Sequence, residues 1–310
     1  MKGLELSREF YNEFGKPMLQ SEFKAFLPSL AVGLVGSGSE CMGFDDEISH
    51  DHDFQPGFCI FVPDEIDEKT FFELERAYSK LPREFKGYKR NVMPFGEERR
   101  HGVIRIGDFY EQKTGSRDGQ LSIGQWFSVA EFALLEATNG EVFFDNFGQF
   151  SKIRESLKYY PDDIMRKKLA GNLFSMSQSG LYNYERCLKR EDSAACQLCL
   201  FEFVKSAVNV CFILNEKYMP YYKWQFAALK GLQYLSELSD SLEFLVSSDN
   251  TQDNAQKKRE IIDRVCTQII LCIKQKKIAD GEQNLQKIAI KINESISDLG
   301  IRNANILAAV

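Results

Sequence analysis

The chain has 310 residues, 44% hydrophobic and 27% charged, which is enough for one large or two ordinary soluble domains. Its net charge of −6 argues against broad binding to nucleic acid or to an anionic membrane, because such binding depends on clustered Lys and Arg. No apolar stretch reaches the ~18 uninterrupted residues of a membrane span, the N-terminus lacks a signal-peptide core, and the eight cysteines lie mostly in apolar runs. We therefore expect a soluble, cytoplasmic protein that has no membrane partner.

The first half of the chain mixes helix and strand patterns. Its apolar spacing predicts, in chain order, helices at 4–15 and 20–28, a strand at 30–35, a strand at 51–62, a helix at 67–81, a loop at 82–100, a strand at 102–106, a helix at 126–138 and a strand at 141–144. Pro56 and Gly57 interrupt the second of these strands, which indicates a bulge or an edge position there.

From residue 151 onward the pattern changes to helices with almost no strand signal. The candidates are 151–158, 161–179, 180–190, 193–217, 220–238, 240–248, 254–277 and 281–298. The expected fold is therefore α+β, with a small mixed-sheet domain over residues 1–150 followed by an all-helical domain over residues 151–310.

The stretch from Leu34 to Phe58 concentrates glycines, hydroxyls and carboxylates between two apolar runs. Glycine lets a backbone turn approach a ligand, so the N–H groups and hydroxyls of Gly36-Ser37-Gly38-Ser39 are candidate phosphate ligands. Asp51 and Asp53 are spaced i, i+2, which on a strand points both carboxylates to one face. That spacing suits two oxygens on one Mg²⁺ ion.

Histidines offer a different metal site in the same stretch. His50 and His52 alternate with Asp51 and Asp53, so on a strand they would face the opposite side. Zinc would need further ligands, for which His101 and scattered cysteines are the candidates, and the sequence therefore favours Mg²⁺ on the aspartates.

The order of these motifs carries a family resemblance. A strand, then Gly36-Ser37, then Asp51-x-Asp53 leading into a second strand resembles the signature of the nucleotidyltransferase superfamily that includes DNA polymerase β and the aminoglycoside nucleotidyltransferases. More narrowly, four segments in order resemble the nucleotidyltransferase-like family DUF4037. They are GLVGSGSECMGFDDEISHDHDFQPGF (33–58), GEVFFD (140–145), YYPDD (159–163) and YMPYYKW (218–224).

The resemblance implies a small mixed sheet that carries the metal site and a helical domain that closes over the nucleotide. The Gly-Ser turn would hold the triphosphate of an NTP, with ATP the first candidate, and Asp51 and Asp53 would hold Mg²⁺. The implied reaction transfers NMP to a hydroxyl of a small molecule, a protein or an RNA end, and pyrophosphate leaves. The acidic chain disfavours an extended nucleic acid as a partner.

The superfamily also uses a third carboxylate, on a later strand, to activate the acceptor hydroxyl. Here the middle of the third strand holds Ile104 and Arg105 instead. Asp108 is the best substitute, ahead of Glu98 and Asp145, although a helix N-cap explains Asp108 equally well. If no acid reaches the metal, the chain is a catalytically weak nucleotide-binding or sensor protein.

Other residues are candidates for contacts with the nucleotide. Lys223 could reach the triphosphate and Tyr222 could lie beside the base, unless this segment is simply a helix start at Pro220 with aromatic core residues. Further candidate phosphate partners are Arg99, Arg100 and Arg105.

Overall fold

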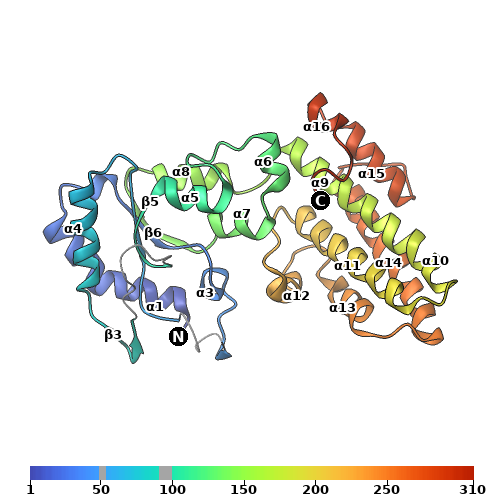
Figure 1. Cartoon of the computed structure of the whole chain (residues 1–310), viewed down its shortest axis with the longest axis horizontal. Helices are drawn as coiled ribbons and strands as arrows, with labels where there is room; N and C mark the ends of the chain where they lie inside the picture. The colour runs from blue at the N-terminus through green and yellow to red at the C-terminus, as the bar shows by residue number, and fades with distance from the viewer. Residues whose placement is uncertain (49–53, 91–99) are drawn as a thin grey trace. The chain divides into compact units, whose positions relative to one another are not determined.

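A computed structural model describes residues 1–48, 54–90 and 100–310. The chain forms two compact units, shown together in Figure 1. The first, which we call the sheet unit, comprises Met1–Leu121 and Ala133–Lys158, and the second, the helical unit, comprises Ser122–Phe132 and Tyr159–Val310. The protein is thus a mixed α/β chain with a small mixed sheet and many helices.

In the described part of the sheet unit, four strands form one sheet in the order β5-β2-β1-β6. They are β1 (Ala31–Leu34), β2 (Cys59–Val62), β5 (Gly102–Arg105) and β6 (Glu141–Asp145). Strand β1 is antiparallel to both β2 and β6, and β2 is parallel to β5. The end of β1 and the starts of the other three strands therefore share one edge of the sheet, which we call the turn edge. The ends of β2, β5 and β6 lie at the opposite edge, the far edge.

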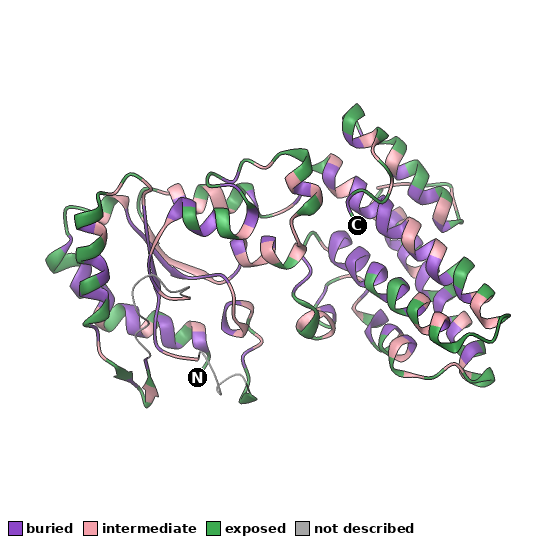
Figure 2. Ribbon diagram, in the orientation of Figure 1, coloured by how far each residue is buried: buried purple, intermediate pink, exposed green. Residues whose placement is uncertain are grey.

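Helices cover both faces of this sheet. Ile60 and Val62 pack into a core with residues of α1 (Gly3–Phe10), α2 (Lys16–Glu22) and α4 (Glu68–Ser79). Between them Phe61 points the other way, where its ring lies 4.1 Å from that of Phe150 and 5.2 Å from that of Phe109. These partners belong to α8 (Gln149–Ser156) and α5 (Ile106–Thr114). Because both faces are covered, β1 and β2 are buried throughout, as Figure 2 shows, and read as continuous apolar runs.

Predictions for the first half of the chain need correction. Of the described residues 54–62 in the second predicted strand, only Cys59–Val62 are in a strand, because Pro56 and Gly57 precede the ladder; positions 51–53 lie outside the described residues. The predicted loop at 82–100 contains a short hairpin, β3 (Glu84–Phe85) with β4 (Tyr88–Lys89), too brief to leave a periodic signal. The predicted helix at 126–138 is two helices, α6 (Ile123–Ser128) and α7 (Glu131–Thr138).

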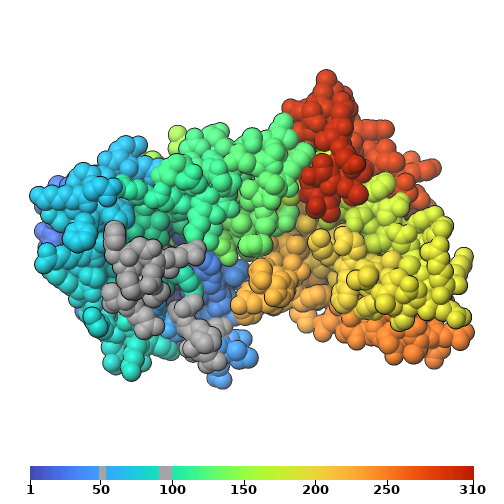
Figure 3. All heavy atoms as spheres, in the orientation of Figure 1, coloured from blue at the N-terminus to red at the C-terminus, as the bar shows by residue number. Residues whose placement is uncertain are grey.

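The helical unit is built around three long helices. They are α9 (Asp162–Met176), α11 (Ser193–Leu214) and α14 (Gln252–Gln275), accompanied by α10 (Tyr184–Leu188), α13 (Ser239–Ser247), α15 (Leu285–Glu294) and α16 (Leu299–Asn303). Helix α9 packs against α11 on one side and against α15 on another. Helices α15 and α16 lie in the red part of the surface in Figure 3. Helix α11 is long and apolar enough to cross a membrane, but most of it is buried in this unit, as in the core helix of a soluble protein.

The predicted helix at 220–238 is wrong. The segment consists of a 3-10 turn (Tyr222–Trp224), the short α12 (Gln225–Leu229) and a second 3-10 turn (Ser236–Leu238). Asn215 provides the reason, because its side chain accepts a hydrogen bond from the Tyr234 N–H and donates one to the Tyr234 carbonyl, both at 2.9 Å. These bonds replace helical partners and divert the backbone.

Candidate functional site

The predicted phosphate turn follows β1 at the turn edge of the sheet. Gly36 and Gly38 adopt φ values of 103° and 125°, which favour glycine. The Gly36 N–H donates to Asn139 Oδ1, and Asn139 Nδ2 donates to the Gly36 carbonyl, both at 2.8 Å. A second tie runs from the Gly140 N–H to the Cys41 carbonyl at 3.0 Å. The Asn139-Gly140 turn therefore fastens the glycine turn to β6.

Beyond Gly36 the turn offers hydrogen-bond donors. Within the described ranges, the N–H groups of Ser37, Gly38 and Ser39 and the two serine hydroxyls donate to no protein acceptor. These three residues are partly exposed, so a ligand can reach them. Successive backbone N–H groups of this kind suit an anion. The helix that follows, α3 (Ser39–Met42), is a single turn and too short to add a useful dipole.

Arg100 lies directly against this turn. Its Nε donates to the Ser37 carbonyl at 3.1 Å, and its Nη2 forms an ion pair with the buried carboxylate of Glu40. A Cβ added to Gly38 would lie 1.7 Å from Arg100 Nη2 and 2.6 Å from Glu40 Oε2. The positive φ therefore favours glycine at position 38, and a side chain there would displace the ends of Arg100 and Glu40.

A second guanidinium stands behind the turn. Arg154 Nη2 donates to the Gly140 carbonyl at 3.2 Å, whereas Arg154 Nη1 is buried and has no hydrogen-bond partner among the described residues. Burial lowers the pKa of Arg154, but an arginine stays charged at neutral pH. Glu141, at the start of β6, is paired with Arg8 instead. Of the guanidinium groups discussed at the turn edge, that of Arg154 thus has no carboxylate partner among the described residues.

Asp45, one of the acids that follow the turn, has a structural role. Its carboxylate accepts a hydrogen bond from the Gly3 N–H at 2.8 Å and lies 3.3 Å from Lys2 Nζ. It thereby satisfies an N–H group at the buried first residue of α1, and its own side chain is buried.

The predicted metal ligands Asp51 and Asp53 lie outside the described residues, as do His50, His52, Glu98 and Arg99. The described residues 54–58 lead into β2 at the turn edge, where Cys59 pairs with Gly33. In residues 1–48, 54–90 and 100–310, no three His, Cys, Asp or Glu side chains are placed to hold a metal.

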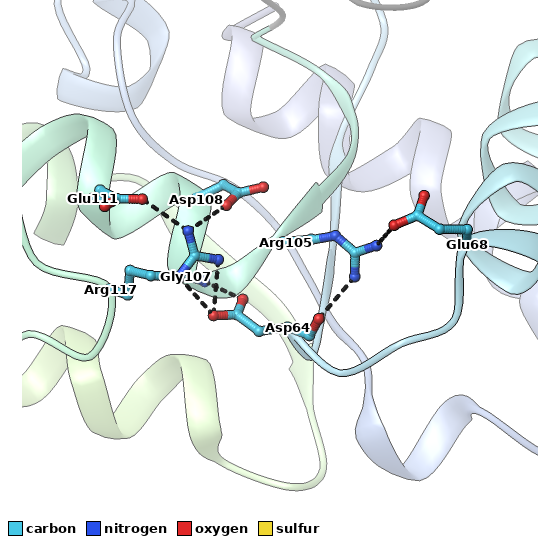
Figure 4. Close-up of polar contacts among 7 residues, drawn as sticks. All are labelled: Asp64, Glu68, Arg105, Gly107, Asp108, Glu111 and Arg117. Carbon is cyan, nitrogen blue, oxygen red and sulfur yellow. Dashed lines mark hydrogen bonds and ion pairs between the residues drawn. The ribbon is translucent and has the colours of Figure 1, made fainter.

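Asp108 lies at the far edge of the sheet, away from the glycine turn. It belongs to the first turn of α5, whose N-cap is Arg105, and its Oδ1 is 2.7 Å from Arg117 Nη1. Arg117 also contacts Asp64 and Glu111, at 3.0 and 2.8 Å (Figure 4). The four residues of β5 separate the two edges by roughly 13 Å at ~3.3 Å per residue. The structure therefore does not bring Asp108 to the turn.

Asp145 and Arg105 also lie at the far edge and have local partners there. Asp145 accepts hydrogen bonds from the Gly148 and Ser151 N–H groups, both at 2.8 Å, and so caps the start of α8. Arg105 pairs with Glu68 at 2.6 Å, as Figure 4 shows. Of the candidate arginines in the described ranges, Arg100 is the one that contacts the turn.

Tyr222 and Lys223 are both exposed in the helical unit, on a 3-10 turn rather than on the predicted helix. The Tyr222 ring lies 4.2 Å from that of Tyr221, and Lys223 Nζ lies 5.4 Å from the Trp224 ring. Their solvent exposure leaves them available to a ligand of this unit.

The helical unit also contains a cleft that the sequence did not suggest. It has a volume of about 660 Å³ and lies among the ends of α9, α11 and α14. Its lining mixes aromatic side chains with opposite charges, including Tyr159, Arg166, Glu216 and Lys276. Arg166 is paired with Asp162 at 2.7 Å, so the lining does not single out one ligand charge.

Comparison with curated proteins found no match. A comparison with family models matched residues 126–225 to the family described as "Domain of unknown function (DUF4037)". The matched range contains three of the four resembling segments, at 140–145, 159–163 and 218–224, and excludes the glycine and aspartate segment at 33–58. The match over residues 126–225 therefore supports the DUF4037 family for this chain.

Proposed function

We propose that the chain is a Mg²⁺-dependent nucleotidyltransferase that moves NMP from an NTP, with ATP the first candidate, to a hydroxyl of a small molecule, a protein or an RNA end. The turn from Gly36 to Ser39 carries this proposal. It presents backbone N–H groups and hydroxyls that bind no protein acceptor in the described ranges, beside the guanidinium of Arg100. The turn also lies at the turn edge, where β2 begins. The first residue of β2, Cys59, is six residues after Asp53 in the sequence.

The chemistry assigns a part to each group. The N–H groups of Ser37 to Ser39 and the guanidinium of Arg100 hold the phosphate oxygens of the NTP, so that its α-phosphorus faces the acceptor. Asp51 and Asp53 offer the hard carboxylate oxygens that Mg²⁺ prefers, and the bound ion would neutralise phosphate charge. The acceptor oxygen forms a bond to the α-phosphorus, the bond to the β-phosphate oxygen breaks, and pyrophosphate leaves while the hydroxyl proton passes to a base.

A second candidate is a nucleotide-binding or sensor protein with little transfer activity. The placement of the acids favours it, because Asp108 and Asp145, two candidates for the third carboxylate, lie at the far edge with structural partners. At the turn edge Glu40 and Glu141 are engaged in ion pairs. A site without a free acid would bind nucleotide and lack a base for the acceptor.

The test is transfer of label from each α-³²P-NTP in the presence of Mg²⁺ and a cell extract. We expect Asp51→Asn/Asp53→Asn to lose at least ~10²-fold in labelling rate, the scale for loss of groups that stabilise transition-state charge. Asp108→Asn is the matched control and should keep the wild-type rate. Equal labelling by wild type and the double variant, or none by either, contradicts the enzyme. NTP binding without transfer by the wild type supports the sensor.

A further inference from the structure

The ion pair between Arg100 and Glu40 covers the α-carbon of Gly38, at the centre of the turn. We propose that Arg100 is a polyphosphate-binding side chain and that Glu40 is an internal competitor, whose carboxylate occupies the guanidinium until a polyphosphate displaces it. The inference rests on the proposed function in one respect, namely that polyphosphate is the ligand of the turn.

The geometry of Arg100 suits a ligand-binding role. Its Nε is anchored on the Ser37 carbonyl at 3.1 Å, which holds the guanidinium against the turn, and 27% of its side chain remains exposed. A guanidinium presents its donors in a planar fork that fits carboxylate and phosphate oxygens alike. The group that now pairs with Glu40 is therefore also suited to phosphate, beside the N–H groups of the turn.

Glu40 has the features of a competitor rather than of a phosphate ligand. Its side chain is only 8% exposed, and its Oε2 would lie 2.6 Å from a Cβ on Gly38, on the same side as Arg100 Nη2. A phosphate held by Ser37 to Ser39 would approach this carboxylate, and like charges repel. Binding would thus require the guanidinium to turn from the carboxylate to the phosphate. Without a ligand, the pair places a positive charge beside the buried Glu40 carboxylate.

The strand that follows Arg100 provides a matched control. Arg105 stands at the other end of β5 and pairs with Glu68, so it is also an Arg–Glu pair, but it lies at the far edge and donates to the carbonyls of Asp64 and Ile66. Substitutions there change charge by the same amount without touching the turn.

The experiment measures binding of Mg²⁺-tripolyphosphate and of MgATP to the full chain by calorimetry. We expect Arg100→Gln to weaken both affinities about 10- to 100-fold, the range for loss of a charge-assisted hydrogen bond. Glu40→Gln should instead tighten them about 3- to 10-fold, because it removes the competing charge. Arg100→Gln/Glu40→Gln should bind more tightly than Arg100→Gln alone, because the repulsion by Glu40 is also removed, and Arg105→Gln and Glu68→Gln should stay within about twofold of wild type. Arg100→Lys, which keeps the charge but loses the fork, should fall between wild type and Arg100→Gln.

The opposite signs of the two single variants are the diagnostic result. If both variants bind more weakly, or if neither changes, Glu40 is not a competitor of polyphosphate. A merely structural pair would lose affinity whichever partner is removed. Thermal melting identifies a variant that fails to fold. If Arg100→Gln fails to fold, the affinity of Arg100→Lys is used in its place. If the wild type binds the probes but transfers no label, the transferase proposal is wrong. The affinities of the variants then still decide this inference. No binding of either probe by the wild type overturns both.

Discussion

Gly38 combines a backbone conformation that favours glycine with side-chain atoms close to its α-carbon. Its φ of 125° strains any residue with a Cβ, and the space that a Cβ would fill is taken by Arg100 and Glu40. Gly43, five residues later, shares the positive φ at 76° but has no atom within 4 Å of that position. A comparison of substitutions at the two glycines therefore distinguishes the effect of backbone strain from the effect of a side-chain clash.

Gly38→Ala should cost about 1–2 kcal/mol or more in the free energy of unfolding and should also weaken polyphosphate binding. Gly43→Ala should cost about 1 kcal/mol and leave binding unchanged, because only the strain is present there. Urea denaturation and calorimetry on both variants check this. Equal effects on binding would show that the contact with Arg100 does not shape the site.

His101, next to Arg100, predicts a pH dependence of stability. Burial, together with the positive charges of Arg100 and Arg90, lowers the pKa of His101 to about 3, and its ring packs against Gly57. The unfolded chain takes up this proton near its ordinary pKa of ~6.5, so stability should fall as the pH drops from about 6.5 toward 3, by at most ~1.4 kcal/mol per pH unit. Urea denaturation between pH 7 and pH 5 should give a shallower slope for His101→Asn. An unchanged slope would assign the effect to other groups.

At the scale of elements, the sheet separates two clusters that the sequence places near each other. Asp108 follows Arg100 by only eight residues, but β5 runs between them and takes Asp108 to the far edge. There the carboxylates of Asp64, Asp108 and Glu111 all contact the guanidinium of Arg117. Asp64 also accepts a hydrogen bond from the Gly107 N–H, and these contacts hold the loop after β2 against α5. Asp108 is a candidate metal ligand when only the sequence is considered. In the folded chain it is instead an ion-pair partner of Arg117.

Asp145→Ala should destabilise the chain by about 1–2 kcal/mol, because it removes the acceptor of two N–H groups at the start of α8. Its distance from the turn predicts wild-type affinity for MgATP. Denaturation and calorimetry test the two parts separately. A loss of affinity without a loss of stability would instead make Asp145 a candidate metal ligand again.

At the scale of the molecule, the segment Ser122–Phe132 belongs to the helical unit although it precedes the last strand of the sheet. Trp126 packs on Tyr160, with ring centroids 6.0 Å apart. Glu131 Oε1 lies 2.9 Å from Lys168 Nζ, whose side chain is 3% exposed. The chain thus passes between the units more than once, whereas the predicted domains, 1–150 and 151–310, assume a single passage.

The buried pair gives this arrangement an energetic test. Glu131→Ala leaves the Lys168 ammonium buried without its carboxylate and should cost about 3–5 kcal/mol, whereas Lys168→Met should cost less because Glu131 is nearer to water. Thermal and urea unfolding of the two variants and of the double variant measure the coupling. Additive, small effects would show that 122–132 contributes little to the helical unit.

The central strands and the long helices could be predicted because the strands are short continuous apolar runs and the helices carry long apolar patterns. The runs at Ala31–Leu34 and Cys59–Val62 and the helix Ser193–Leu214 are examples. The break after Leu229 could not, since it depends on Asn215, whose side chain meets the Tyr234 backbone only in the folded chain. Local pattern carries no information about such a partner.

By itself, the sequence determined the glycine turn, the paired aspartates and the change from mixed to helical structure, because glycine, carboxylate spacing and apolar period are local properties. Only the tertiary structure decided which side chains reach the turn. Strand direction brought Asn139 and Arg100 to it and carried Asp108 and Asp145 to the far edge. The physical reason is that pairing between distant strands assigns each residue to an edge, and that pairing appears only when the sheet has formed.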